Sequence, residues 1–290
     1  TGTDPSSISL TQLAGDRRSG GGMAGTKCRS PNPDLVDRWI AAGYGQGDGA
    51  GYKPFMYVRD VPSTGTSSMV KSRVTGRTHH YLSRQEFKVH LEAEYSRSTK
   101  NIREQYALLP LAETQQIAAD LGVRHPTYPT TRTPTVMTTD LLLTLDWQDG
   151  DQLLAISVKL TKDLTHRNLE KLLIERIYWN NRGVKWVLIT EKEISTHRVN
   201  NLCFFELSLT DDCGLSSPIT PEDFSRRFEE NCSRQLSFNA IMTKSIKEMD
   251  IDVHTGHTLL GQAVWRHHSR LDIERNTLTH RGNVLLREVA

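Results

Sequence analysis

The most constraining feature of the sequence is the order of apolar runs in the middle of the chain. Val136–Asp146 and Leu153–Lys159 predict two strands, and the QDGD turn between them predicts a hairpin. An amphipathic segment at 165–181 predicts a helix, and the apolar run Val184–Thr190 predicts a strand buried on both faces. The second hairpin strand, the helix and the last strand make a βαβ unit, so we expect an α/β fold with a mixed sheet.

Other patterns extend this core toward the N-terminus. A hairpin is expected around Gly76, and Ser83 and Glu86 have the spacing of a capping box that opens a helix ending near Arg97. A strand in NIREQYALLPL and a short helix at 112–121 follow. Residues 24–60 are rich in Gly, Pro and Asp, and predict an irregular arm with turns rather than a packed element.

The C-terminal part has a different pattern of apolar and polar residues. Residues 221–268 contain three helix-like patterns, and two short strand-like runs, LDIERN and NVLLREV, follow with a Gly turn between them. Three helices and a terminal hairpin predict a winged-helix domain. We therefore expect a tag or linker at 1–23, a first domain at 24–195 that includes the arm, and a winged-helix domain at 196–290.

Composition limits the classes of function. The net charge is only +2, from 36 Lys and Arg against 34 Asp and Glu. A protein that holds DNA alone usually has a strong basic excess, so DNA is permitted but partners are expected to help hold it. The four cysteines lack the spacing of zinc sites or of a disulfide framework. Neither a membrane-length apolar run nor a signal peptide is visible, which predicts a cytoplasmic protein with no membrane partner.

The candidate chemistry lies on the central hairpin. Asp140 begins one strand, and Ser157 and Lys159 lie two residues apart on the other, so both point to the same face. A carboxylate that holds a divalent cation beside a lysine that orients water or offsets charge is what phosphodiester hydrolysis needs. Mg²⁺ prefers several oxygen ligands, so a second carboxylate is required, and Glu86 on the preceding helix is the best candidate.

Each of these residues also has an ordinary structural interpretation. Glu86 could only cap its helix, Asp140 could be an exposed strand-end residue, and Lys159 could protect a sheet edge from pairing. Each alternative is plausible singly, but all three together, in this order and spacing, are not.

Longer strings of sequence resemble a known family. They are GYGQGDGAGYKPFMYVRDVPSTG, TGRTHHYLSRQE, NIREQYALLPL, VRHP, VMTTD, ISVK and LEKLLIERIYW. Over roughly residues 40–195 the chain resembles the TnsA family, the endonuclease subunits of heteromeric cut-and-paste transposases. That family has a restriction-endonuclease-like core of the PD-(D/E)xK type, and the C-terminal part matches only in general layout.

The resemblance implies roles for particular residues. Glu86, Asp140 and Lys159 fall on the family's catalytic residues, and the first two, with the Val158 backbone carbonyl, are expected to bind one or two Mg²⁺ ions, for which Mn²⁺ can substitute.

Two further positions are possible supporting residues. Ser157 stands where the restriction-enzyme pattern has a carboxylate, and a neutral residue there is typical of the TnsA family. Glu175 matches a glutamate on the following helix, although a place on the surface of that helix is slightly favoured by the residues alone.

The function implied is hydrolysis of the 5′, non-transferred strand ends of a transposon. The expected partners are double-stranded transposon-end DNA, a TnsB-like DDE transposase, and a TnsC-like AAA+ ATPase bound through the C-terminal domain. The resemblance also implies a bacterial protein, which would be nucleoid-associated when it is assembled on DNA. Two rival functions are a non-catalytic DNA-binding assembly factor of the transposase and a free-standing restriction-type nuclease.

Overall fold

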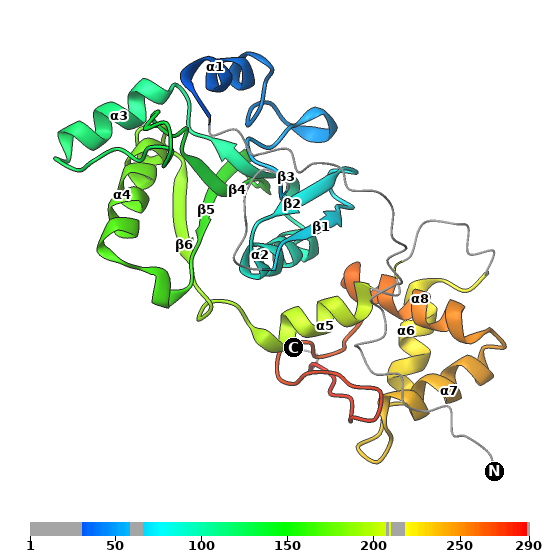
Figure 1. The fold of residues 1–290 in the computed structure, drawn as a ribbon. Helices are drawn as coiled ribbons and strands as arrows, with labels where there is room; N and C mark the ends of the chain where they lie inside the picture. Colours follow the sequence, from blue (N-terminus) through cyan, green and yellow to red (C-terminus); the bar gives the residue numbers. More distant parts are fainter. Residues whose placement is uncertain (1–30, 59–65, 207–208, 210–217, 289–290) are drawn as a thin grey trace, which may run out of the picture.

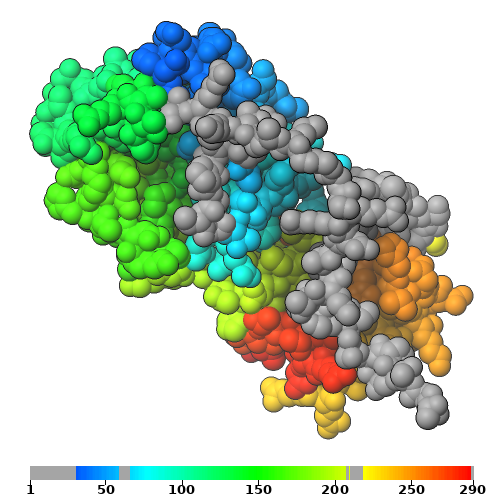
Figure 2. Space-filling model, in the orientation of Figure 1, coloured from blue at the N-terminus to red at the C-terminus, as the bar shows by residue number. Residues whose placement is uncertain are grey.

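The structure is a computed structural model that describes residues 31–58, 66–206, 209 and 218–288. An α/β part formed by the first two thirds of the chain adjoins a helical C-terminal part (Figure 1). In the space-filling view the two parts lie at opposite ends of the molecule (Figure 2). The segment predicted as a tag or linker lies outside the described residues.

The central sheet has the predicted mixed topology. Its strands are β3 (Thr99–Ala107), β4 (Thr138–Trp147), β5 (Gly150–Val158) and β6 (Lys185–Ile189), in that spatial order. β3, β4 and β5 pair antiparallel, and β5 pairs parallel with β6 across the helix α4 (His166–Asn180). The mixed α/β architecture fits a restriction-endonuclease-like core. The expectation that the last strand is buried on both faces is wrong, because β6 is an edge strand whose residues are exposed or half-buried.

Helices cover both faces of this sheet (Figure 1). α3 (Leu111–Asp120) and α4 pack on one face, where they enclose a cluster that includes Leu142 and Ala155. α2 (Arg84–Tyr95) packs on the other face. The hairpin of β1 (Ser68–Lys71) and β2 (Thr78–Tyr81) lies beside α2 and turns, as predicted, near Gly76. The alternation of side chains along β4 and β5 thus supplies two separate apolar layers.

The N-terminal arm differs from its prediction. α1 (Pro33–Ala41) is a regular helix, capped by the Asn32 side chain and followed by a 3-10 turn at Gly49–Gly51. Val36 and Phe55 pack with Ala107 and Val136 in a third apolar cluster. The prediction of an unpacked arm is therefore wrong for its described part, because apolar residues on both sides of the glycine-rich run pack at the end of β3.

The C-terminal part contains α5 (Thr196–Glu206), α6 (Pro221–Glu230), α7 (Phe238–Glu248) and α8 (Val253–Trp265). The three predicted helices are present. In place of the two predicted strands, the described residues form isolated antiparallel bridges, Leu271 with Leu286 and Ser237 with Asn283. The winged-helix assignment and the domain boundaries stay predictions. α5 packs against both α2 and α8, so the apolar core runs continuously from the sheet into the C-terminal helices.

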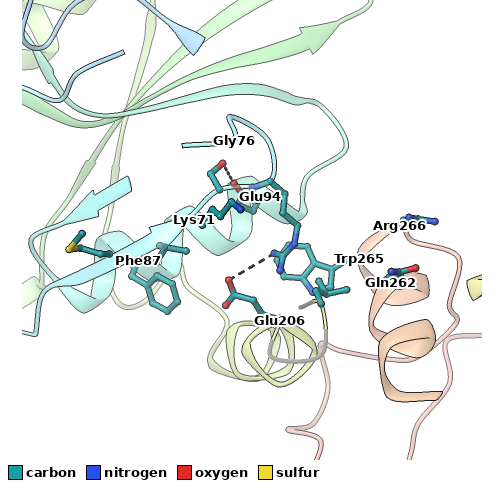
Figure 3. A pocket seen from close by; sticks show the side chains of 13 residues that line it. Lys71, Gly76, Phe87, Glu94, Glu206, Gln262, Trp265 and Arg266 are labelled. Atoms are coloured by element: carbon teal, nitrogen blue, oxygen red, sulfur yellow. Dashed lines mark hydrogen bonds and ion pairs between the residues drawn. The ribbon is translucent and has the colours of Figure 1, made fainter. Parts of the chain in front are cut away.

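A cavity of about 910 Å³ opens where the β1–β2 hairpin and α2 meet α5 and α8. Side chains from all four elements surround it, including Lys71, Glu94, Glu206 and Trp265 (Figure 3). The residues that line it do not include the candidate catalytic residues. It is therefore a space between the two parts of the molecule and separate from the carboxylate cluster described below.

The packing of the arm generates a test based on two glycines with similar backbone angles. Gly45 and Gly47 have φ of 68° and 82°, but a Cβ on Gly45 would lie 2.5 Å from the Ala107 Cβ, whereas a Cβ on Gly47 would meet nothing within 4 Å. Both changes to Ala carry similar backbone strain, so their difference reports the contact. We expect Gly45→Ala to lower the free energy of unfolding by about 1–3 kcal/mol more than Gly47→Ala in urea denaturation. Equal losses would mean that the arm does not pack on β3 in solution.

Candidate active site

Asp140 is at the centre of the candidate site, and strand pairing puts it there. Leu141 pairs with Ile156, so the start of β4 lies beside the end of β5. Asp140 Oδ2 accepts hydrogen bonds from the Val158 backbone N–H at 2.7 Å and from Lys159 Nζ at 2.9 Å. The side chain is almost buried, so these two donors hold the carboxylate in one orientation.

Lys159 follows β5 directly and continues its pairing, because its N–H donates to the Ile189 carbonyl at 3.1 Å. Its Nζ also donates to the Val158 carbonyl at 2.9 Å. Burial alone would lower the pKa of Lys159, but the charge and hydrogen bond of Asp140 outweigh it and raise the pKa to about 12. The lysine therefore stays protonated at neutral pH, and it serves as a cation and hydrogen-bond donor rather than as a base.

Glu86 reaches the same place from α2 while it also caps that helix. Its carboxylate accepts from the Leu82 N–H at 3.0 Å and from the Ser83 hydroxyl at 2.8 Å. Burial, and next the charge of Asp140, raise the pKa of Glu86 to about 7. Glu86 thus caps α2, and the capping box fixes its carboxylate near Asp140. Its role in catalysis and metal binding stays a prediction.

Gln105 lies between these two carboxylates, and the sequence analysis missed it. Its Nε2 is 3.4 Å from Glu86 Oε2 and 3.5 Å from Asp140 Oδ1. The residue is buried in the middle of β3 and has a φ of 48°, a value that is uncommon for residues other than glycine. No sequence pattern distinguishes this glutamine from its neighbours in NIREQYALLPL. Its position near the carboxylates depends on a backbone conformation that the amino-acid sequence does not indicate.

Glu175 lies on the other side of Asp140, on α4, in a fully buried position. Its Oε1 accepts hydrogen bonds from Thr139 at 2.8 Å and from Ser157 at 2.5 Å. Burial, and next the charge of Asp140, raise the pKa of Glu175 to about 7. The residues alone slightly favoured a surface position for Glu175, and that expectation is wrong. The short serine side chain orients Glu175, and it accepts in turn from Trp186 Nε1 at 3.2 Å.

The donor set fits a hard divalent cation. Glu86 and Asp140 are carboxylates in a buried site, and their mutual repulsion is part of what raises the pKa of Glu86. A divalent cation between them would offset this repulsion, and oxygen-only donors suit Mg²⁺. Within the described residues, no three His, Cys, Asp or Glu side chains form a metal-binding group. Further ligands must therefore come from oxygens of other kinds, such as the Val158 carbonyl.

Other polar residues of the α/β part make contacts away from the candidate site. His79 is buried and pairs with Glu104 at 2.9 Å, whereas the His80 ring packs edge-on against Tyr57, so the adjacent histidines face apart. In the QDGD hairpin, Lys100 bridges Asp146 and Asp151, at 3.0 and 2.6 Å. These acidic residues lie at the far end of the hairpin from Asp140.

Comparisons with known proteins agree with the class of protein that the fold and the candidate site indicate. A mixed sheet that gathers two carboxylates and a lysine at one edge fits a nuclease core of the restriction-endonuclease-like type. Residues 96–191 match the family model of the TnsA-like endonuclease N terminal. The chain is also 43% identical, over 162 residues, to the transposon Tn7 transposition protein TnsA of Escherichia coli. The chain is therefore similar to TnsA over part of its length, and residues 96–191 resemble the N-terminal endonuclease domain of TnsA-like proteins.

The matches cover only part of each chain. The similarity to the Escherichia coli protein covers 55% of this chain and 58% of that protein, so the chain matches less than two thirds of the relative's length. Asp140, Lys159 and Glu175 lie within the segment matched by the family model, whereas Glu86 lies before it. The position of Glu86 in the site thus rests on the structure of α2. In the part of the chain that the structure describes, none of the helices has the length and apolar character of a membrane span.

The electrostatics of the site can be tested with Asp140→Asn. Removal of the Asp140 charge is expected to lower the pKa of both Glu86 and Glu175 from about 7, and burial is expected to keep both above the ordinary value of 4.5. The measurement is NMR titration of glutamate carboxyl carbons in EDTA, with Asp151→Asn at the far end of the hairpin as the control. If Asp140→Asn leaves both titrations unchanged, the three carboxylates do not share a site.

Proposed function

We propose that this protein is a metal-dependent DNA endonuclease that hydrolyses the 5′, non-transferred strands at transposon ends. The observation that carries the proposal is the convergence of Glu86, Asp140 and Lys159 from three elements. Asp140 and Lys159 lie within the segment that resembles a TnsA-like endonuclease domain. The similarity to a transposition protein supports transposon ends as the substrate.

Glu86, Asp140 and the Val158 carbonyl are the groups that would hold Mg²⁺, or Mn²⁺ in its place. When bound, one or two such ions would supply positive charge to a phosphate oxygen and a lowered pKa for the attacking water. The crowding of buried carboxylates supports this assignment, because the chain brings more negative than positive charge to the site. The ion would also compete with Lys159, which donates to both Asp140 and the Val158 carbonyl.

Hydrolysis forms a bond from the water oxygen to phosphorus and breaks the bond from phosphorus to the 3′ oxygen. The leaving oxygen takes a proton and departs as a hydroxyl. Lys159, with its pKa of about 12, remains charged and stabilises the negative charge that grows on the phosphate. Ser157 and Glu175 do not reach the phosphate in this scheme. They support the β5 end behind Asp140 through their buried hydrogen bond.

The proposed partners are a TnsB-like DDE transposase, which would cut and join the 3′ ends, and a TnsC-like AAA+ ATPase that docks on the C-terminal part. A net charge of +2 supports dependence on partners, because so small an excess gives little non-specific affinity for phosphates. A nuclease of this kind stays inactive on random DNA until a complex delivers the transposon end.

The proposal is tested by cleavage of end-labelled transposon DNA with this chain and its cognate transposase in Mg²⁺. We expect Asp140→Ala and Lys159→Ala each to reduce 5′-strand cleavage by about a hundredfold or more, since each removes a group that acts on the reacting phosphate. Joining of the 3′ ends should continue and give fused, replicative products. Asp151→Ala, a carboxylate change at the far end of the same hairpin, is the matched control and should cut normally.

Two outcomes would contradict the proposal. Normal 5′ cleavage and excision by both variants would make the chain a non-catalytic assembly factor. Efficient cutting of a short DNA site by the isolated chain, without any transposase, would make it a free-standing restriction-type nuclease.

A further inference from the structure

A single atom of the Gln105 side chain, Nε2, lies near both candidate metal-binding carboxylates. This atom lies 3.4 Å from Glu86 Oε2 and 3.5 Å from Asp140 Oδ1. Hydrogen bonds from an amide N–H are usually about 2.7–3.2 Å long, so both contacts are weak as hydrogen bonds. A group buried at this point for hydrogen bonding alone would be expected to approach at least one carboxylate more closely.

The same spacing is close to that of neighbouring ligands in a metal site. Ligand oxygens at about 2.0–2.1 Å from Mg²⁺ in octahedral geometry stand about 2.9 Å apart when they are adjacent. The terminal atom of Gln105 therefore lies only about half an ångström farther from each carboxylate oxygen than a third ligand atom would.

The backbone at Gln105 has a conformation that residues other than glycine seldom adopt. Glu104 pairs with Leu141 and Tyr106 with Thr139, so Gln105 faces Asp140 across the two strands. Its φ of 48° turns it out of the ladder, and its carbonyl accepts from the Phe55 N–H of the arm at 3.1 Å. Left-handed conformations of residues other than glycine persist where surrounding structure imposes them, and they concentrate at functional sites.

The amide can present either of its atoms to the carboxylates. Gln105 Oε1 accepts a hydrogen bond from the Thr138 hydroxyl at 3.0 Å. A hydroxyl accepts as readily as it donates, and the terminal torsion of glutamine is soft and roughly two-fold. A half-turn of the amide therefore brings Oε1 toward Glu86 and Asp140, and Nε2 then donates to Thr138 in its place.

We propose that Gln105 is a metal ligand through Oε1, the third side-chain oxygen of a site formed with Glu86 and Asp140. Without metal the NH₂ group faces the two carboxylates and reduces their repulsion. With a divalent cation the amide turns and coordinates it. This inference rests on the proposed function, since it assigns the ligands of the ion that the nuclease would use, and it accounts for the missing third side chain.

The test compares Gln105→Glu with Gln105→Met in the 290-residue chain. Glutamate offers oxygen in either orientation but has no N–H to donate, whereas methionine has a similar length and offers neither. Binding of Mn²⁺ is measured by titration calorimetry, and thermal melting is measured in EDTA and in Mn²⁺. Circular dichroism in EDTA establishes that each variant is folded, and Asp140→Ala is the control without the central carboxylate.

We expect Gln105→Met to weaken Mn²⁺ binding by about tenfold or more and to reduce stabilisation by the ion. Gln105→Glu should bind at least as tightly as the wild type and show a larger rise in melting temperature, because the ion relieves an added repulsion. Equal loss in both variants would mean that Gln105 acts only as a donor, and unchanged binding in both would give it no role toward metal. Either result overturns the inference and leaves the nuclease proposal standing. A wild type that Mn²⁺ neither binds nor stabilises would overturn both.

Discussion

The hydrogen bond from the Val158 N–H to Asp140 Oδ2 ties the sheet to the site. It exists because β4 and β5 pair in one register, and a slip of one residue would turn Asp140 away from the end of β5. The same register places Lys159 on the carboxylate. Glu86 depends on a separate element, so the packing of α2 on the sheet decides whether the second carboxylate arrives.

The candidate site holds more acidic than basic side chains in a buried position. Glu86, Asp140 and Glu175 place three carboxyl groups around one protonated lysine, and the two glutamates have a pKa of about 7 as a result of burial first and of the Asp140 charge second. In the absence of metal, the folded state disfavours ionisation of both glutamates, because their pKa there lies above the ordinary value of 4.5. The free energy of unfolding is therefore expected to fall as pH rises through 7 and both groups lose their protons. A bound divalent cation would offset that loss of stability, which links metal binding to the stability of the site.

Much of the fold and part of the site could be predicted from the sequence. Hairpin spacing and strand alternation were enough to place Asp140 beside Lys159, because both follow from local periodicity. α1 was missed, although Asn32 followed by proline is a helix-start signal, because the surrounding glycines suggested a loop. Gln105 could not be predicted, since its position depends on a left-handed backbone and on a hydrogen bond from Phe55, fifty residues earlier in the chain. Tertiary contacts of this kind leave no periodic pattern in the sequence.

The central claim is that Glu86 and Asp140 hold one divalent cation beside Lys159. The most direct measurement is anomalous X-ray diffraction from crystals of the 290-residue chain soaked in Mn²⁺. The account predicts an anomalous peak between the carboxylates of Glu86 and Asp140, with the Lys159 ammonium moved off Asp140 Oδ2. A peak at another place in a well-occupied crystal, or density that leaves Lys159 bonded to Asp140 with no ion between the carboxylates, would contradict it.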